Sequence, residues 1–185
     1  MKQWYHAKPK GNGSACSFYL NDEENSFFAS ILRQKSWDAS RRVGSFHKDD
    51  PNEKVIVKFS CKEICAIINS LENKTEFSGY HGSNQIVRFT FGPYYSKGED
   101  RKQLGYSFIV NKESKEDSTN KQTFLMGFDF DEGMELLLFL KYLVNRSFDN
   151  ERKLRAKARQ KYNKSTNKKV EKPASQQENE EELVW

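Results

Sequence analysis

Apolar and polar side chains alternate along several short stretches in the first half of the chain. Cys16, Phe18 and Leu20, for example, alternate with Ala, Ser and Tyr neighbours, which is the period of two that a half-buried strand requires. The segment 49–52 (Asp-Asp-Pro-Asn) is typical of a turn, because Asp and Asn bond to their own backbone and Pro fixes φ. The strand candidates on either side of this turn are 14–20, 26–35, 37–46 and 54–59.

A helix is predicted directly after the last of these strands. Ser60 and Glu63 have the spacing of a capping box, in which each side chain bonds to the backbone N–H of the other residue. Apolar residues three and four positions apart then form one stripe, as in an amphipathic helix that ends near Asn73. The stripe consists of Ile64, Ile67, Ile68 and Leu71.

The second half of the chain has the same order of elements. Asp129 precedes Glu132 and the apolar stretch 134–144 as Ser60 precedes Glu63 and its helix. The two junctions of strand, cap and helix lie 69 residues apart, measured from Ser60 to Asp129. Such an internal period indicates two similar structural units. The strand candidates of the second unit are 75–82, 84–91, 103–112 and 122–128.

Two successive units of four antiparallel strands and a helix resemble the Whirly fold. Plant Whirly proteins and kinetoplastid guide-RNA-binding proteins share this fold, and one such unit makes the related positive-cofactor-four-like coactivators. The resemblance covers residues 14–148, with repeats over 14–73 and 74–148, and it is one of pattern, since the Lys-Gly-Lys-Ala-Ala-Leu motif of plant Whirly proteins is missing. It implies an α+β fold that binds single-stranded nucleic acid and assembles into a homo-oligomer. A barrel of the oligonucleotide-binding (OB) fold is the alternative, but it explains the two helix junctions less well.

The distribution of charge favours an anionic partner. The chain has 31 Lys and Arg against 26 Asp and Glu, a formal net charge of +5. Positive charge is spread over the body and concentrated after Asn145, whereas negative charge is concentrated in the last residues. A basic body can hold an acidic tail against its binding face until a polyanion displaces the tail.

Aromatic and cationic side chains are interleaved within the predicted sheets. Sequence-independent binding of single strands needs flat rings for base stacking and cations that follow the phosphates. We expect most Phe in the core, whereas Tyr and Trp keep a polar group that tolerates water. The predicted nucleic-acid-binding residues are Arg33, Lys35, Trp37, Arg41, Arg42, Tyr80, Arg88, Tyr94, Tyr95, Lys97, Arg101, Lys102 and Tyr106.

Both ends of the chain are predicted to lie outside the folded domain. We expect a flexible basic and aromatic arm over 1–13, a basic extension over 149–172 and an acidic tail over 173–185. The tail is too polar to fold alone, and it resembles the partner-recruiting tail of replicative single-stranded DNA-binding proteins, especially bacteriophage ones. Its predicted partner-binding residues are Glu180, Glu181, Glu182, Leu183, Val184 and Trp185.

The sequence offers little support for catalysis or a metal cofactor. Asp129, Asp131 and Glu132 cluster as if to bind Mg²⁺, but helix capping accounts for Asp129 and Glu132. The three Cys and three His lack zinc or disulfide spacing, and the chain has no phosphate-binding glycine loop. No stretch resembles a signal peptide or a membrane span. We therefore expect a protein that is not an enzyme, in a reducing compartment such as the cytoplasm, or the host cytoplasm if it is viral.

Three functional hypotheses follow from these patterns. The first is a sequence-independent single-stranded DNA-binding protein of replication, recombination or repair, whose body coats the strand and whose tail recruits replication or recombination proteins. The alternative is an RNA-binding or transcription-regulating protein of the same fold. The third is a protein-interaction adaptor that binds no nucleic acid.

Overall fold

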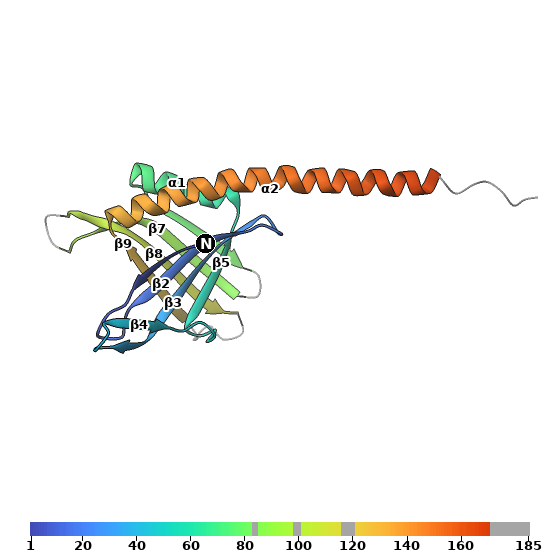
Figure 1. Ribbon diagram of the computed structural model, residues 1–185. Coiled ribbons are helices and arrows are strands. Elements are labelled where there is room, and N and C mark those ends of the chain that lie inside the picture. The colour runs from blue at the N-terminus through green and yellow to red at the C-terminus, as the bar shows by residue number, and fades with distance from the viewer. Residues whose placement is uncertain (83–84, 98–100, 116–120, 171–185) are drawn as a thin grey trace, which may run out of the picture. The chain divides into compact units, whose positions relative to one another are not determined.

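The strands of the first half form one antiparallel sheet, drawn in blue and teal in Figure 1. The computed structural model describes residues 1–82, 85–97, 101–115 and 121–170. The strands of this first sheet are β1 (Lys2–His6), β2 (Ser14–Asn21), β3 (Ser26–Asp38), β4 (Val43–Phe46) and β5 (Lys54–Phe59). Their order is β1-β2-β3-β4, and β5 pairs with the first half of β3 while β4 pairs with its second half.

The strands of the second half form a separate antiparallel sheet. They are β6 (Phe77–Gly82), β7 (Gln85–Tyr95), β8 (Gln103–Ser114) and β9 (Lys121–Phe128), and they pair in chain order. Two separate antiparallel sheets confirm the predicted α+β fold, and they exclude the alternative of a single OB barrel.

Each sheet is followed by a helix that begins with the predicted capping box. The helices are α1 (Cys61–Asn73) and α2 (Phe130–Val170). At α1, Ser60 Oγ accepts from Glu63 N at 3.3 Å and Glu63 Oε2 accepts from Ser60 N at 2.8 Å. At α2, Asp129 Oδ1 accepts from Glu132 N at 2.8 Å and Glu132 Oε2 accepts from Asp129 N at 3.1 Å. In Figure 1, α1 and the first turns of α2 lie on the same side of the sheets.

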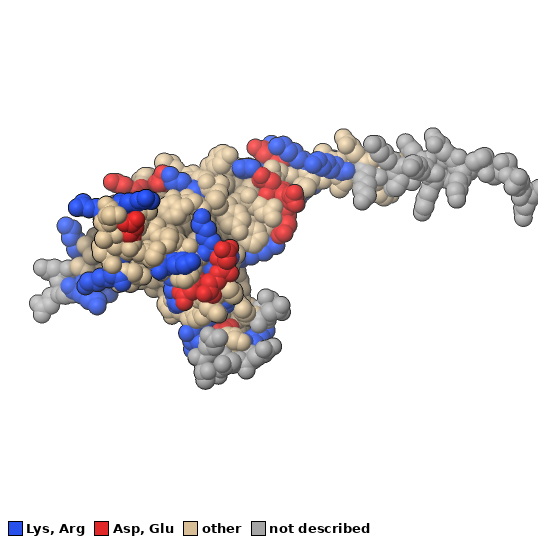
Figure 2. Space-filling model, turned by 60° about the horizontal axis from the view of Figure 1, so that its bottom comes forward, with Lys and Arg blue, Asp and Glu red and all other residues tan. Residues whose placement is uncertain are grey.

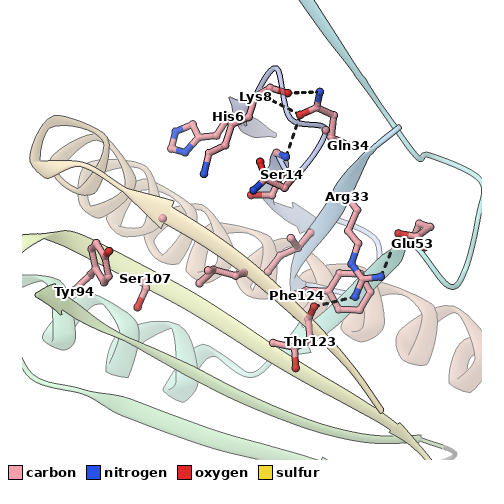
Figure 3. A pocket seen from close by; sticks show the side chains of 16 residues that line it. His6, Lys8, Ser14, Arg33, Gln34, Glu53, Tyr94, Ser107, Thr123 and Phe124 are labelled. Atoms are coloured by element: carbon pink, nitrogen blue, oxygen red, sulfur yellow. Dashed lines mark hydrogen bonds and ion pairs between the residues drawn. The ribbon is translucent and has the colours of Figure 1, made fainter. Parts of the chain in front are cut away.

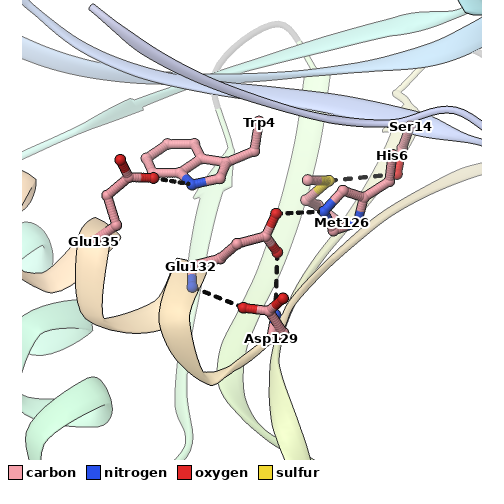
Figure 4. Close-up of polar contacts among 7 residues, drawn as sticks. All are labelled: Trp4, His6, Ser14, Met126, Asp129, Glu132 and Glu135. Carbon is pink, nitrogen blue, oxygen red and sulfur yellow. Dashed lines mark hydrogen bonds and ion pairs between the residues drawn. The ribbon is translucent and has the colours of Figure 1, made fainter. Parts of the chain in front are cut away.

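The two capping glutamates also contact histidines from the opposite sheet. His81 of β6 contacts Glu63 Oε1 at 2.8 Å, and His6 of β1 contacts Glu132 Oε1 at 2.7 Å, as Figure 4 shows for the second pair. Burial disfavours the Glu63 carboxylate, but hydrogen bonds from Ser60 and His81 outweigh it and hold the pKa of Glu63 below its usual value. Each capped helix start is therefore tied to the opposite sheet.

Aromatic side chains from both sheets form a shared core. Phe18, Phe89, Phe91, Phe108 and Phe124 are each at most 1% exposed, as expected for apolar residues on the inner faces of two sheets. The contacts between repeats include Phe18–Phe108 (5.8 Å between ring centroids), Phe59–Phe89 (5.0 Å) and Trp4–Phe128 (5.6 Å). The two sheets are thus held together by edge-on and tilted ring packing.

The first residues are not the flexible arm that the sequence predicts for 1–13. Lys2–His6 form β1, which pairs with β2 from Lys2 opposite Phe18 to His6 opposite Ser14. Trp4 is only 4% exposed, and its Nε1 donates to Glu135 Oε2 at 3.0 Å (Figure 4). Burial of this large ring, together with a satisfied indole N–H, holds the segment in the sheet.

Gln34 fixes a bend in β3. The pairing register of β3 shifts between Gln34 and Ser36, where its partner strand changes from β5 to β4. The buried Gln34 Oε1 accepts from Lys8 N at 2.8 Å and Gly13 N at 3.0 Å, and its Nε2 donates to Lys8 O and Ser36 O, both at 3.0 Å. One amide side chain thereby ties the β1–β2 loop to the point where the sheet curls.

The chain divides into two compact units, Met1–Phe148 and Asp149–Trp185. The first holds both sheets, α1 and α2 up to Phe148. In the second, the described part of α2 has an ion pair between Arg155 and Glu151 at 2.5 Å. Within the part of the chain that the structure describes, no helix is both long and apolar enough to cross a membrane.

Candidate nucleic-acid interface

The outer face of the second sheet meets the loop between β1 and β2 in a cleft of about 540 Å³. Figure 3 shows Tyr94 and Ser107 on β7 and β8 at one side of the cleft, and His6 and Lys8 at the other. The edge strand β9 contributes Gly127 to the lining between them. The cleft is therefore open to a ligand that lies across the sheet.

A second cleft, of about 660 Å³, lies at the end of the sheet where β7 turns toward β8. Tyr94 lines both clefts, so they adjoin. In the second cleft the Arg101 guanidinium lies over the Tyr95 ring, 5.6 Å from its centroid. We name the two clefts together the second-sheet track, which is defined by Lys8, Lys74, Tyr94, Tyr95, Lys97, Arg101, Ser107 and Gly127.

Two consecutive exposed tyrosines in the track lie at an irregularity in strand pairing. The register between β7 and β8 shifts between Tyr94 and Tyr95, and the two side chains are 50% and 38% exposed. Gly105, opposite Tyr94, has φ +154°, and a Cβ there would lie 2.1 Å from Phe128 O. Only glycine fits at this position, so the irregularity is built into the sequence.

The floor of the track is flat because its residues are small. Ser107 and Gly127 lie side by side on the neighbouring strands β8 and β9. A Cβ at Gly127 would meet no atom within 4 Å, so nothing in the surrounding chain requires glycine there. Glycine inside a strand weakens the sheet and marks a place where a ligand or another backbone approaches closely.

Positive charge predominates along the track. The described charged residues that line its two clefts, besides His6, are Lys8, Arg33, Lys74, Lys97, Arg101, Glu53 and Glu76. Arg33 and Glu53 pair with each other at 3.2 Å, which leaves four cations and one carboxylate among the described residues. Blue side chains accordingly gather toward the left-hand end of Figure 2, where the β7–β8 hairpin lies in Figure 1. This charge suits an anionic ligand.

The structure thus brings four of the predicted binding residues together: Tyr94, Tyr95, Lys97 and Arg101. Two others, Tyr80 and Arg88, form a separate pair on β6 and β7, with the guanidinium 5.6 Å from the ring centroid. Arg88 also pairs with Glu113 at 3.2 Å. Arg88 lies six residues before Tyr94 along β7, or roughly 20 Å away at the rise of a strand.

Two predicted binding residues have structural positions instead. Tyr106 is a core residue, 7% exposed, and its hydroxyl donates to Leu71 O at 3.0 Å. Arg33 joins the two sheets: it donates to Thr123 O at 3.0 Å, and its guanidinium lies 4.6 Å from the centroid of the Phe124 ring (Figure 3). Both side chains are occupied by contacts within the protein.

Of the remaining predicted residues, Lys102 lies beside the track, where its backbone N–H donates to Ser96 Oγ at 3.0 Å, and the others lie apart from it. Lys35, Trp37 and Arg41 belong to β3 and the turn that follows it, where Arg41 pairs with Asp38 at 3.8 Å. The Asp38 pKa is lowered by hydrogen bonds from the Ser40 side chain and the Arg41 backbone. Lys102 is exposed next to Arg101, whereas Arg42 lines a groove on the outer face of the first sheet. The predicted partner-binding residues Glu180, Glu181, Glu182, Leu183, Val184 and Trp185 lie outside the described residues.

The sequence pattern did not single out Lys8, Lys74 or Gly127 as parts of the site. Lys74 ends α1 with φ +54°, and Lys8 was assigned to a flexible arm. A glycine within a predicted strand is the one available signal for Gly127. As for metals, no group of three or more His, Cys, Asp or Glu that could hold an ion occurs within the described ranges.

Comparison with known proteins identifies the fold but no sequence family. No protein-family model matches the chain, and a search of curated proteins finds no match. Several solved structures match over most of their length. They include Arabidopsis thaliana WHY1 (TM-score 0.53, 15% identity, 84% of this chain and 91% of that chain), the plant transcriptional regulator PBF-2 (0.55, 15%, 84% and 85%) and Trypanosoma brucei MRP1/MRP2 (0.52, 14%, 80% and 84%).

These similarities agree with the arrangement of the strands and helices. Both kinds of protein that the repeat pattern resembles, plant Whirly and kinetoplastid, are among the matching structures. At 14–15% identity the likeness concerns the fold and not the individual residues. The chain has a Whirly-like fold, as its repeated order of strands, cap and helix predicts.

Proposed function

We propose that this chain binds single-stranded nucleic acid through the second-sheet track. The observation that carries the proposal is the pair of exposed rings, Tyr94 and Tyr95, beside Lys97 and Arg101. Stacking on an aromatic ring is worth about 1–3 kcal/mol per base and is independent of sequence, while the cations contact phosphates. The flat floor at Gly127 leaves room for the strand.

Within this function, we propose a sequence-independent role in DNA replication, recombination or repair. Its support is the composition of residues 173–185, which resembles the recruiting tails of replicative single-stranded DNA-binding proteins. An RNA-binding or transcription-regulating role is the alternative, and the likeness to the plant transcriptional regulator PBF-2 favours it. Proteins distinguish the two nucleic acids through the 2′-OH, so competition between oligonucleotides of matched sequence separates these roles.

The full-length protein is expected to bind oligo-dT at low salt with strong dependence on salt. Since each phosphate contact to a single strand contributes about −0.7 to the slope of log K against log salt, the four cations of the track predict a slope of about −3 or steeper. Fluorescence anisotropy of labelled oligo-dT at several salt concentrations measures it. Absence of binding at low salt would show that the proposed function is wrong.

Removal of the acidic tail should separate strand binding from partner recruitment. A chain that ends at Lys172 is expected to bind oligo-dT as tightly as the full chain or more tightly, because an internal anionic competitor is removed. It should fail to retain replication proteins that immobilised full-length protein retains. A full-length variant with Glu180, Glu181 and Glu182 changed to Gln is the matched control for charge. Weaker DNA binding after truncation contradicts this role for the tail.

We also propose that the protein is a homo-oligomer. Support comes from an exposed apolar stripe on α2, whose members lie four residues apart and hence on one helix face. They are Phe130 (49% exposed), Met134 (56%), Leu138 (62%) and Tyr142 (55%). A second copy of the chain would bury this stripe.

A further inference from the structure

The outer face of the first sheet is hollowed into a groove of about 930 Å³, separate from the second-sheet track. Small residues form its floor: Ala15 and Ser17 on β2 and Ser30 on β3. Ser17 and Ser30 hydrogen-bond to each other through their hydroxyls at 2.8 Å. Because these side chains are small, the floor is shallow, and larger side chains stand on either side of it.

The rings of Tyr5, Tyr19 and Phe46 line the sides of this groove. Tyr5 of β1 and Phe46 of β4 are 5.7 Å apart between centroids. Tyr19 and Phe28 are 5.3 Å apart and nearly parallel, at 14°. The bend at Gln34 carries β4 over the sheet, so that Phe46 reaches Tyr5 although β1 and β4 are not paired. The Tyr5 side chain is 56% exposed, so its ring is accessible to a ligand.

The charge of the groove has one sign. Its charged lining residues within the described part of the chain are Arg42, Lys48 and Lys54, without a carboxylate. Lys54 Nζ donates to Lys48 O at 2.7 Å, which holds its ammonium group at the rim. The Tyr19 phenol adds no negative charge, because a tyrosine is neutral near pH 7 and burial raises the pKa of Tyr19 further. An apolar peptide would fill the groove without using the cations, whereas a polyanion that carries flat rings uses both features.

We propose that this groove is a second binding surface for single-stranded nucleic acid, in which bases stack against Tyr5, Tyr19 and Phe46. Arg42, Lys48 and Lys54 contact the phosphates. The proposal rests on the proposed function, and among the residues of this surface only Arg42 belongs to the binding residues predicted from the sequence. A strand bound by both surfaces gains contacts from each sheet, so loss of either surface weakens binding without abolishing it.

The test compares two double variants of the full chain. Lys48→Gln with Lys54→Gln removes two cations from the groove, and Lys62→Gln with Lys141→Gln removes two exposed cations from the helices. The groove variant should have a salt slope for oligo-dT that is less steep by about 1.4, and about 25-fold weaker affinity near 0.1 M salt. The helix variant should match the parent. Thermal unfolding followed by circular dichroism checks that both variants are folded.

A second measurement uses the unmodified protein. Oligonucleotides with 5-iodouracil in place of thymine are photocrosslinked, and the modified residues are found by mass spectrometry. Crosslinks at Tyr5, Tyr19 or Phe46 support the groove. Crosslinks confined to Tyr94 and Tyr95, with an unchanged salt slope in the groove variant, overturn this inference and leave the proposed function standing. No binding by the parent overturns both, and a groove variant that changes only the oligomeric state assigns the groove to a second copy.

Discussion

Replacing Tyr94 and Tyr95 together with leucine is expected to weaken the binding of single-stranded oligonucleotides by about 30-fold or more. Each ring offers stacking worth about 1–3 kcal/mol per base, and leucine keeps an apolar side chain without a stacking face. Both residues are exposed, so the core should stay intact. Anisotropy titration of labelled oligo-dT at one fixed salt concentration measures the loss.

Two controls separate stacking from other causes of this loss. Tyr162→Leu changes an exposed tyrosine on α2 that lies outside the apolar stripe of this helix, and it should leave affinity unchanged. The salt slope of the double variant should equal that of the parent, because no cation is removed. A double variant with the parent's affinity would show that Tyr94 and Tyr95 do not stack on bases.

Gly127→Val is expected to change stability and binding in opposite directions. Since glycine inside a strand costs roughly 0.5–1 kcal/mol relative to a residue with a side chain, and valine favours strands, the free energy of unfolding should rise by a similar amount. A side chain at this position would occupy the floor of the second-sheet track. We expect affinity for oligo-dT to fall by about tenfold, or 1.4 kcal/mol.

Urea unfolding and DNA titration of one preparation test both parts of this expectation. Gly105→Val is the contrasting variant, because a Cβ there would lie 2.1 Å from Phe128 O, so it should lower the free energy of unfolding. If Gly127→Val is more stable and binds as the parent does, no ligand approaches the floor of the track.

Local patterns predict much of the fold because they depend on neighbours in sequence. The capping boxes at Ser60 and Asp129 need residues only three positions apart, and both are confirmed. The sequence pattern does not predict β1. Its five residues, Lys2–His6, are too few for their alternation to distinguish a strand from a flexible arm. Its main evidence is the packing of Trp4 on Phe18 and Phe128, more than 100 residues apart from each other.

The candidate site depends on which face of a strand each side chain occupies, and local patterns settle this less well. Tyr94 and Tyr106 are both strand tyrosines, but one is exposed and the other lies in the core. Arg33 is a cation near aromatic residues in the sequence, as a binding residue would be, yet it donates a hydrogen bond to Thr123 O, 90 residues away in sequence. The pairing of strands that lie far apart in sequence decides which face each side chain occupies, and a single sequence does not reveal this pairing.

The exchange of capping contacts between the repeats has a consequence for how the chain folds. Glu63 at the start of α1 meets His81 of the second sheet, and Glu132 at the start of α2 meets His6 of the first. A chain cut after Asn73 would leave each capping glutamate without its histidine partner and each sheet with half of the aromatic core. The duplicated halves are therefore not independent modules. We therefore expect both halves to unfold in a single transition.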